Sequence, residues 1–74
     1  MYYWNMIMNN GNVYIAESDK NTVRAFMTQV FGEGLTENTY GIIKLKDTNE
    51  EAVVNLKYLS EITYKRYGSL KFIK

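Results

Sequence analysis

The chain contains no cysteine and no histidine, which limits how its 74 residues can be stabilised. Disulfides are excluded, and a structural zinc site would lack its two most common ligands. A chain near this length buries only about 60% of the surface that its unfolded form exposes, so its core is modest. We therefore expect one compact domain over residues 1–74, with association into a homo-oligomer as the remaining source of stability.

The same absence restricts the chemistry available to the protein. Imidazole and thiolate are the most common general base, transition-metal ligand and nucleophile in enzymes. The adjacent Glu50 and Glu51 point in different directions on a strand or a helix, so they do not converge on a substrate. Seven tyrosines, three phenylalanines and one tryptophan indicate contact surfaces instead. We expect a binding protein with no enzymatic activity, no cofactor and no metal site.

Two short stretches resemble ligand-binding loops but fail at required positions. Residues 32–34 begin like a dinucleotide-binding loop, yet they follow a predicted helix, and Glu37 stands where the third glycine is needed. Residues 47–49 begin like a calcium loop, but Ala52 and Tyr58 stand where that loop needs glycine and glutamate. We interpret the first stretch as a helix end and the second as a solvated turn.

The sequence also indicates where the protein resides. No run approaches the roughly 18 apolar residues that a membrane helix needs. Residues 1–5 lack the positive charge and the small-residue cleavage site of a signal peptide. We therefore expect a cytoplasmic protein with no membrane contact.

Asn10-Gly11 lies between two alternating runs and predicts a β-hairpin, because this dipeptide fits the positive φ values of a type I′ turn. A two-residue turn fixes which side chains share a face. The face expected to join the core carries Trp4, Met6, Met8, Val13 and Ile15. The second face carries Tyr3, Asn5, Ile7, Tyr14 and Ala16.

A helix is predicted after this hairpin. Its apolar residues recur at helical spacing and form one stripe that we expect to lie on a sheet. The stripe comprises Val23, Phe26, Met27, Val30 and Phe31. Ser18 or Asp19 is expected to cap the first free amides, and Gly32 or Gly34 is expected to end the helix.

From Thr39 onward the pattern predicts strands again, at 40–46, 52–56, 61–67 and 70–73, with turns at 47–50 and 57–59. A helix over 49–67 is the alternative, favoured by Thr48 and Glu51 at capping-box spacing. We rank it second, because the apolar residues scatter around its axis and Val53-Val54 favours extended backbone. The predicted fold class is α+β, an antiparallel sheet of four to six strands with one packed helix in the order ββαβββ.

Aromatic and basic residues alternate near the C-terminal end. Such a pattern stacks nucleobases and tracks phosphates, but tyrosine and arginine are also enriched at protein interfaces. A plainer interpretation is structural, namely cross-strand tyrosine pairs and an edge strand guarded by lysine. The candidates for protein contact are Tyr58, Tyr64, Arg66 and Tyr67. The candidates for nucleic-acid contact are Tyr64, Lys65, Arg66 and Tyr67.

A second candidate surface lies on the face of the first hairpin that the helix is not expected to cover. Tyr3, Ile7 and Tyr14 make that face apolar in the predicted register. An apolar sheet face without a cover is a place for a protein partner or a second copy of the chain.

These candidates make a non-enzymatic protein-binding module the leading hypothesis. Its partner is expected to be a host or cognate protein whose own contacts it blocks sterically. The chain is rich in residues with A/T-rich codons and is similar in size and composition to phage-borne inhibitors of host defence, so we expect an inhibitor from a phage or mobile element. The alternatives are a small nucleic-acid-binding regulator, which the near-neutral net charge disfavours, and a homo-oligomeric scaffold or ligand-binding protein.

Overall fold

A computed structural model of the protein describes residues 1–65, which form one antiparallel five-stranded sheet and one α-helix. The elements in chain order are β1 (Tyr2–Met8), β2 (Val13–Ser18), α1 (Val23–Phe31), β3 (Tyr40–Leu45), β4 (Glu51–Asn55), the 3₁₀-helix η1 (Leu56–Tyr58) and β5 (Leu59–Lys65). The predicted α+β fold class and element order are confirmed. The alternative helix over 49–67 is wrong, and the predicted strand at 70–73 lies outside the described residues.

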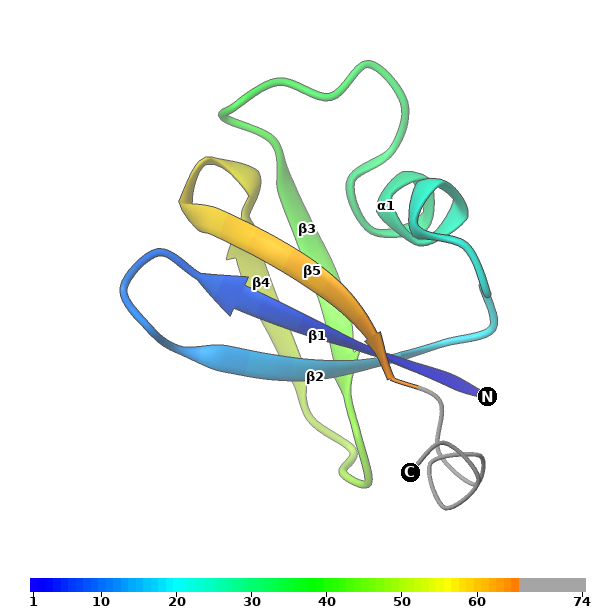
Figure 1. The fold of residues 1–74 in the computed structure, drawn as a ribbon. Coiled ribbons are helices and arrows are strands. Elements are labelled where there is room, and N and C mark those ends of the chain that lie inside the picture. The colour runs from blue at the N-terminus through cyan, green and yellow to red at the C-terminus, as the bar shows by residue number, and fades with distance from the viewer. Residues whose placement is uncertain (66–74) are drawn as a thin grey trace.

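The sheet is strongly curled. Its strand order is β4-β3-β2-β1-β5, so β4 and β5 are the two edges. β2 and β3 are paired only at Ala16 with Leu45 and at Glu17 with Lys44. Because this junction is so short, β1, β2 and β5 run together across the β3–β4 hairpin instead of parallel to it (Figure 1). The two groups of strands enclose the core between them.

The β1–β2 turn differs from the predicted two-residue turn. Met8 N–H donates to the Asn12 carbonyl at 2.8 Å, and Gly11 N–H donates to the Met8 carbonyl at 3.0 Å. The loop therefore has three residues, and only its last, Gly11, needs a positive φ, at 93°. A type I turn followed by a left-handed glycine is the usual three-residue hairpin loop.

The longer loop shifts the predicted register by one residue, which exchanges the two faces of β2. The inner face, defined here as the face with Trp4, Met6 and Met8, receives Tyr14 and Ala16 from β2. The outer face receives Val13 and Ile15. The observed pairs are Met6 with Tyr14, Trp4 with Ala16, Asn5 with Ile15 and Ile7 with Val13. The predictions for β1 are confirmed, and those for β2 are wrong.

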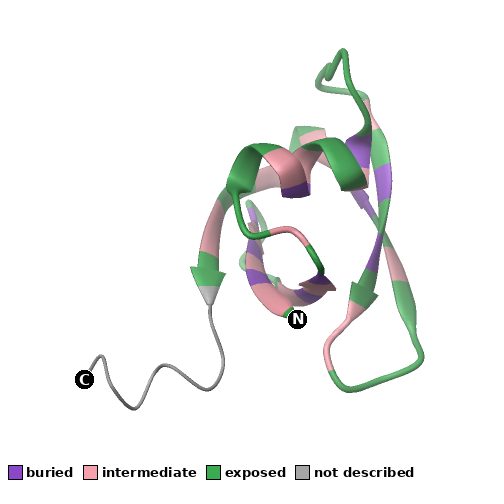
Figure 2. Cartoon of the chain, turned by 90° about the vertical axis from the view of Figure 1, so that its right-hand side faces the viewer, coloured by how far each residue is buried: buried purple, intermediate pink, exposed green. Residues whose placement is uncertain are grey.

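The core lies between the inner face and α1. Its buried members come from both strand groups and from the helix, as the purple segments in Figure 2 show. They are Trp4, Met6, Met8, Ala16, Phe26, Phe31, Ile43 and Val54. The Trp4 indole stacks on the Phe26 ring at 5.1 Å between centroids and 11° between planes. Its Nε1–H also donates to the Lys20 carbonyl at 3.1 Å, so both the ring and its polar atom are used.

The predicted apolar stripe of α1 is confirmed except at its first residue, Val23, which is 51% exposed. The helix cap is Thr22, whose side chain accepts from Ala25 N–H at 3.2 Å, in place of the predicted Ser18 or Asp19. Ser18 is instead buried, where it donates to Gln29 and accepts from Lys20 N–H. Gly32 ends the helix as predicted, with a φ of 81°.

Gly41 on β3 permits the close approach of α1. A Cβ atom at this position would lie 2.5 Å from both Val30 Cγ1 and the Val30 carbonyl oxygen, and 2.9 Å from Phe31 Cδ1. Two of these three atoms belong to side chains, but the carbonyl belongs to the helix backbone and cannot rotate away. The short distance between α1 and β3 is therefore possible only because Gly41 has no side chain.

We predict that Gly41→Ala lowers the free energy of unfolding by about 1–3 kcal/mol, because the methyl group overpacks this contact. Urea unfolding followed by fluorescence of Trp4, the single tryptophan, measures the change. Thr28→Ala on the exposed side of α1 is the control and should change stability by no more than about 0.5 kcal/mol. Equal stability of the two variants would contradict the close approach of α1 to β3.

Candidate protein-contact surface at β3 and β4

A cleft of about 450 Å³ opens between β4 and the β1–β2 turn. Its lining residues share one property, which is that none of them carries a charge. They are Met8, Asn9, Asn10, Asn12, Tyr14, Tyr40, Val53, Val54, Asn55 and Tyr58. A site without charge recognises its ligand by shape and by hydrogen bonds from amides and phenols.

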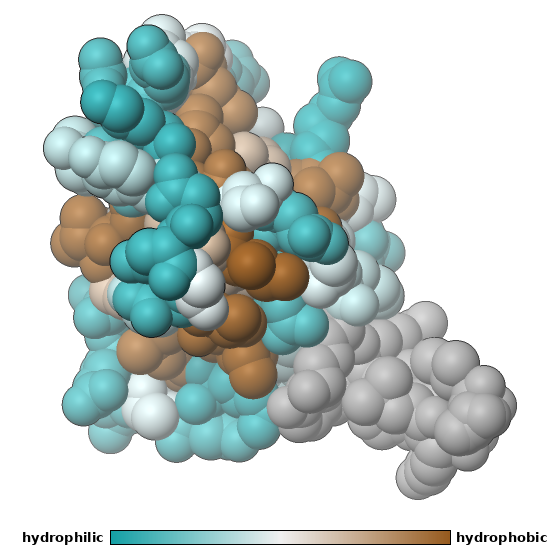
Figure 3. Space-filling model, turned by 60° about the vertical axis from the view of Figure 1, so that its left-hand side comes forward, coloured by the Kyte–Doolittle hydropathy of each residue, from teal (hydrophilic) through white to brown (hydrophobic). Residues whose placement is uncertain are grey.

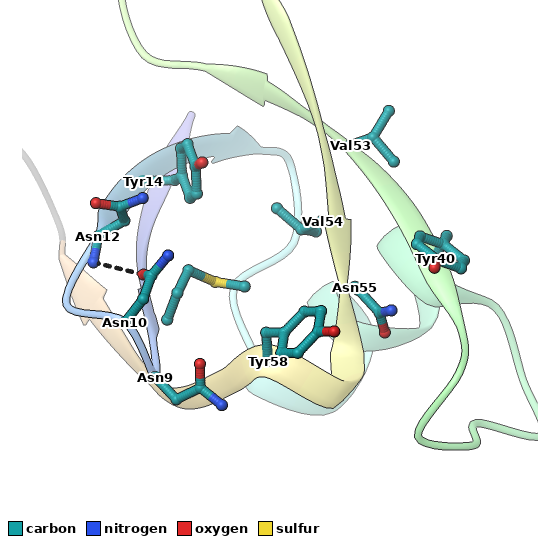
Figure 4. Close-up of a pocket in the computed structure, with 10 residues that line it drawn as sticks. Asn9, Asn10, Asn12, Tyr14, Tyr40, Val53, Val54, Asn55 and Tyr58 are labelled. Carbon is teal, nitrogen blue, oxygen red and sulfur yellow. Dashed lines mark hydrogen bonds between the residues drawn. The ribbon is translucent and has the colours of Figure 1, made fainter.

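Tyr14 and Tyr58 stand on opposite sides of this cleft, and Val54 points into it between them (Figure 4). Met8 and Val54 are buried, so they form an apolar floor. The sequence separated these two tyrosines into different candidate surfaces. The one-residue shift of β2 brings Tyr14 to the inner face, and η1 turns Tyr58 towards the same opening.

Two of the asparagines in the cleft hold the loops in place. The Asn10 side chain accepts from Asn12 N–H at 3.0 Å, which braces the β1–β2 turn. The Asn55 side chain accepts from Lys57 N–H at 2.9 Å and caps η1. Asn9 N–H donates to the Tyr58 carbonyl at 2.7 Å, so the turn and η1 are joined at one end of the cleft. The loops at the mouth of the cleft are therefore fixed by hydrogen bonds.

The outer face of β3 and β4 exposes an apolar strip that the sequence analysis missed. The strip consists of Tyr40, Ile42 and Val53, which are 66%, 60% and 68% exposed. Ile42 lies directly opposite Val53 in the β3–β4 register. Apolar surface also gathers in a band between polar residues on the side of the molecule seen in Figure 3. The dipeptides Ile42-Ile43 and Val53-Val54 signal this strip, because alternation buries only one residue of each.

The strip and the cleft form one continuous surface. Tyr40 and Val53 line the cleft and also line a shallower groove on the outer face, where Gln29 and Val30 of α1 form the other wall. The surface thus extends from the β1–β2 turn, across the edge of β4, to the helix. Its apolar residues are carried by strands, by η1 or by α1, which makes the surface rigid.

Tyr3 and Ile7 lie on the outer face as predicted, but not beside Tyr14. Lys46 places its Nζ 5.6 Å from the centre of the Tyr3 ring, a cation–π contact. Elsewhere on this face Asn5 Nδ2 donates to Thr63 Oγ1 at 3.2 Å. The expected patch of Tyr3, Ile7 and Tyr14 is therefore wrong, because the shifted register turns Tyr14 to the inner face and places Val13 opposite Ile7 instead.

The predicted C-terminal cluster is divided by the fold. Tyr64 packs on the inner side of β5, with its ring 4.8 Å from that of Trp4 and 6.0 Å from that of Tyr2. This contact supports the structural interpretation of Tyr64, which is 41% exposed. Lys65 is the last residue of β5 and pairs with Tyr3 along the backbone. Arg66 and Tyr67 lie outside the described residues.

The described residues also bear on other classes of site. Among residues 1–65, no group of three or more acidic residues lies together in a way that could hold a metal ion. No helix in this part is both long and apolar enough to cross a membrane. Comparisons with protein families, with curated proteins and with solved structures give no match for this chain. The contact surface is therefore assigned from geometry and burial.

Tyr64 and Tyr40 are both exposed, but they are predicted to differ in their effect on stability. Tyr64→Ala should lower the free energy of unfolding by about 1–2 kcal/mol, because the ring contact with Trp4 is lost. Tyr40→Ala should change it by no more than about 0.5 kcal/mol, because the ring is largely in solvent. Urea unfolding of both variants makes the comparison. A larger loss for Tyr40→Ala would contradict these roles.

Proposed function

We propose that the protein is a non-catalytic protein-binding module that contacts its partner through the strip of Tyr40, Ile42 and Val53. The observation that carries this proposal is the exposure of three large apolar side chains next to one another on a rigid strand pair. Water contact with such a group is unfavourable by about 25 cal/mol for each Å² of apolar surface, so a partner that covers it gains free energy. Contiguous apolar patches with a polar rim are typical of protein interaction sites.

The neighbouring cleft supports the same proposal. Tyr58 is half exposed at its edge, and tyrosine side chains commonly supply a large share of the binding energy at interfaces. The cleft lining offers no cation for a phosphate group, which disfavours nucleic acid as the ligand of this surface. A protein side chain inserted between Tyr14 and Tyr58 would meet aromatic walls and an apolar floor.

The proposed partner is a host or cognate protein, and the proposed mode of action is steric occlusion. A module with one rigid contact face and no catalytic group acts on a partner only by covering its surface. An inhibitor carried by a phage or mobile element is the biological role that we attach to this mode. The small size and the composition of the chain support this role.

The experiment is site-specific photocrosslinking in an extract. Benzoylphenylalanine in place of Ile42 should form an adduct with another protein, because this position lies at the centre of the strip. The matched control has the same substitution at Val13, an exposed valine of β2 that lines neither the cleft nor the groove. The adduct should still form when the extract is irradiated at high salt, since no charge lines the cleft beside the strip.

Adducts of twice the mass of the chain report self-association and do not count as evidence for this function. Equal yields from positions 42 and 13 would contradict the proposal, as would adducts with nucleic acid alone. Ile42→Asp in the same extract should abolish the adduct formed from benzoylphenylalanine at Tyr58. Its persistence would place the contact away from the strip.

A further inference from the structure

β4 has a free edge along which no described strand pairs, because it is bonded only to β3. Leu45 N–H donates to the Glu50 carbonyl at 3.0 Å, and Leu56 N–H donates to the Thr39 carbonyl at 2.9 Å. Bonded and non-bonded residues alternate along an antiparallel pair, so the even-numbered residues of β4 face β3. The main-chain groups that point outward belong to Glu51, Val53 and Asn55.

β4 also lacks three of the features that protect edge strands. Its pairing with β3 is free of bulges, and its sequence contains neither proline nor lysine. The opposite edge differs, because the pairing of β5 with β1 shifts register between Ile7 and Met8. An irregular edge resists a further strand, whereas a regular edge accepts one. Of the two edges, β4 is the one suited to pairing.

We infer that β4 pairs with β4 of a second copy of this chain, antiparallel about a two-fold axis at Val53. In this register Val53 lies opposite Val53 of the second copy, and Glu51 lies opposite Asn55 of the second copy. The outward N–H and C=O groups of all three residues then have partners. Other symmetric registers leave some of these groups unpaired.

Charge favours a second copy as the occupant of this edge. Each Glu51 carboxylate meets an Asn55 amide, so no like charges are opposed, and the next charge along the second copy is Lys57. Glu51 begins β4 and Lys57 follows its end. In an antiparallel pair of two β4 strands, Glu51 of each copy therefore lies near Lys57 of the other copy. Val53 is exposed and contacts its own symmetry mate, and β-branched cross-strand pairs stabilise a sheet.

The cleft leaves room for this pairing. It separates the edge of β4 from the β1–β2 turn, so that no described element covers the edge (Figure 4). The inference goes beyond the proposed function, because it concerns the edge of the sheet and a second copy. The pairing of the two β4 strands also brings the strip of one copy next to the strip of the second copy. Ile42 and Val53 of each copy then lie on either side of the two-fold axis.

The test is the mass of the protein in solution across a wide range of concentration, by light scattering after gel filtration. We expect a mass twice that of one chain at high concentration. Val53→Pro should weaken association about tenfold or more, because it removes an outward N–H without breaking a bond to β3. Val13→Pro is the matched control, because its N–H also points away from its paired strand, β1, but belongs to β2, which is not bonded to β4. It should leave association unchanged.

A charge exchange tests the register without proline. Lys57→Glu and Glu51→Lys should each weaken self-association about fivefold, because like charges then meet at both ends of the paired strands. A mixture of the two variants should recover the wild-type affinity, because opposite charges meet in the mixed dimer. Amide exchange should show Val53 N–H protected only at high concentration, and Ala52 N–H protected at every concentration.

A monomer at all concentrations would overturn the inference, as would a dimer that neither Val53→Pro nor the charge variants affect. Protection of Val53 N–H only in the presence of a different protein would also overturn it. A monomeric chain that still crosslinks another protein from position 42 would leave the proposed function intact. The two proposals therefore fail separately.

Discussion

The contact of Trp4 with its neighbours determines how the rest of the chain is arranged. Its indole stacks on Phe26 of α1, its Nε1–H binds the Lys20 carbonyl ahead of that helix, and its edge meets Tyr64 of β5. One side chain thus joins the central strand β1 to the helix and to an edge strand. A chain without cysteine depends on such shared contacts, because its core is small.

The curl of the sheet follows from this arrangement and creates the contact surface. β2 and β3 pair at only two positions, so the β3–β4 hairpin turns away from β1 and covers the core from another side. The inner residues of this hairpin, such as Ile43 and Val54, are buried as a result. Their neighbours Ile42 and Val53 must then point outward. The exposed strip is therefore a geometric consequence of two strands that are apolar on both faces.

Much of the fold could be predicted from the sequence, because helical and strand periodicities are local. The stripe of α1 and the β3–β4 hairpin were predicted in this way. The faces of β2 could not be, because Asn10-Gly11 suits both a two-residue and a three-residue loop, and one residue decides whether Tyr14 faces inward. The position of Tyr14 opposite Tyr58 across the cleft could not be predicted, since it depends on the curl of the sheet. The strip was missed because no faces were assigned to the strands predicted at 40–46 and 52–56, where apolar residues occur at adjacent positions.

The bulge in β5 limits how far a sheet of this kind can grow. A protein with two regular edges adds copies at both ends without limit and risks forming fibres. This chain has one regular edge and one interrupted edge. Once the regular edges of two copies face each other, only interrupted edges remain at the ends. Any assembly through β4 is therefore closed and self-limiting, and the irregularity of β5 opposite Ile7 and Met8 limits its size.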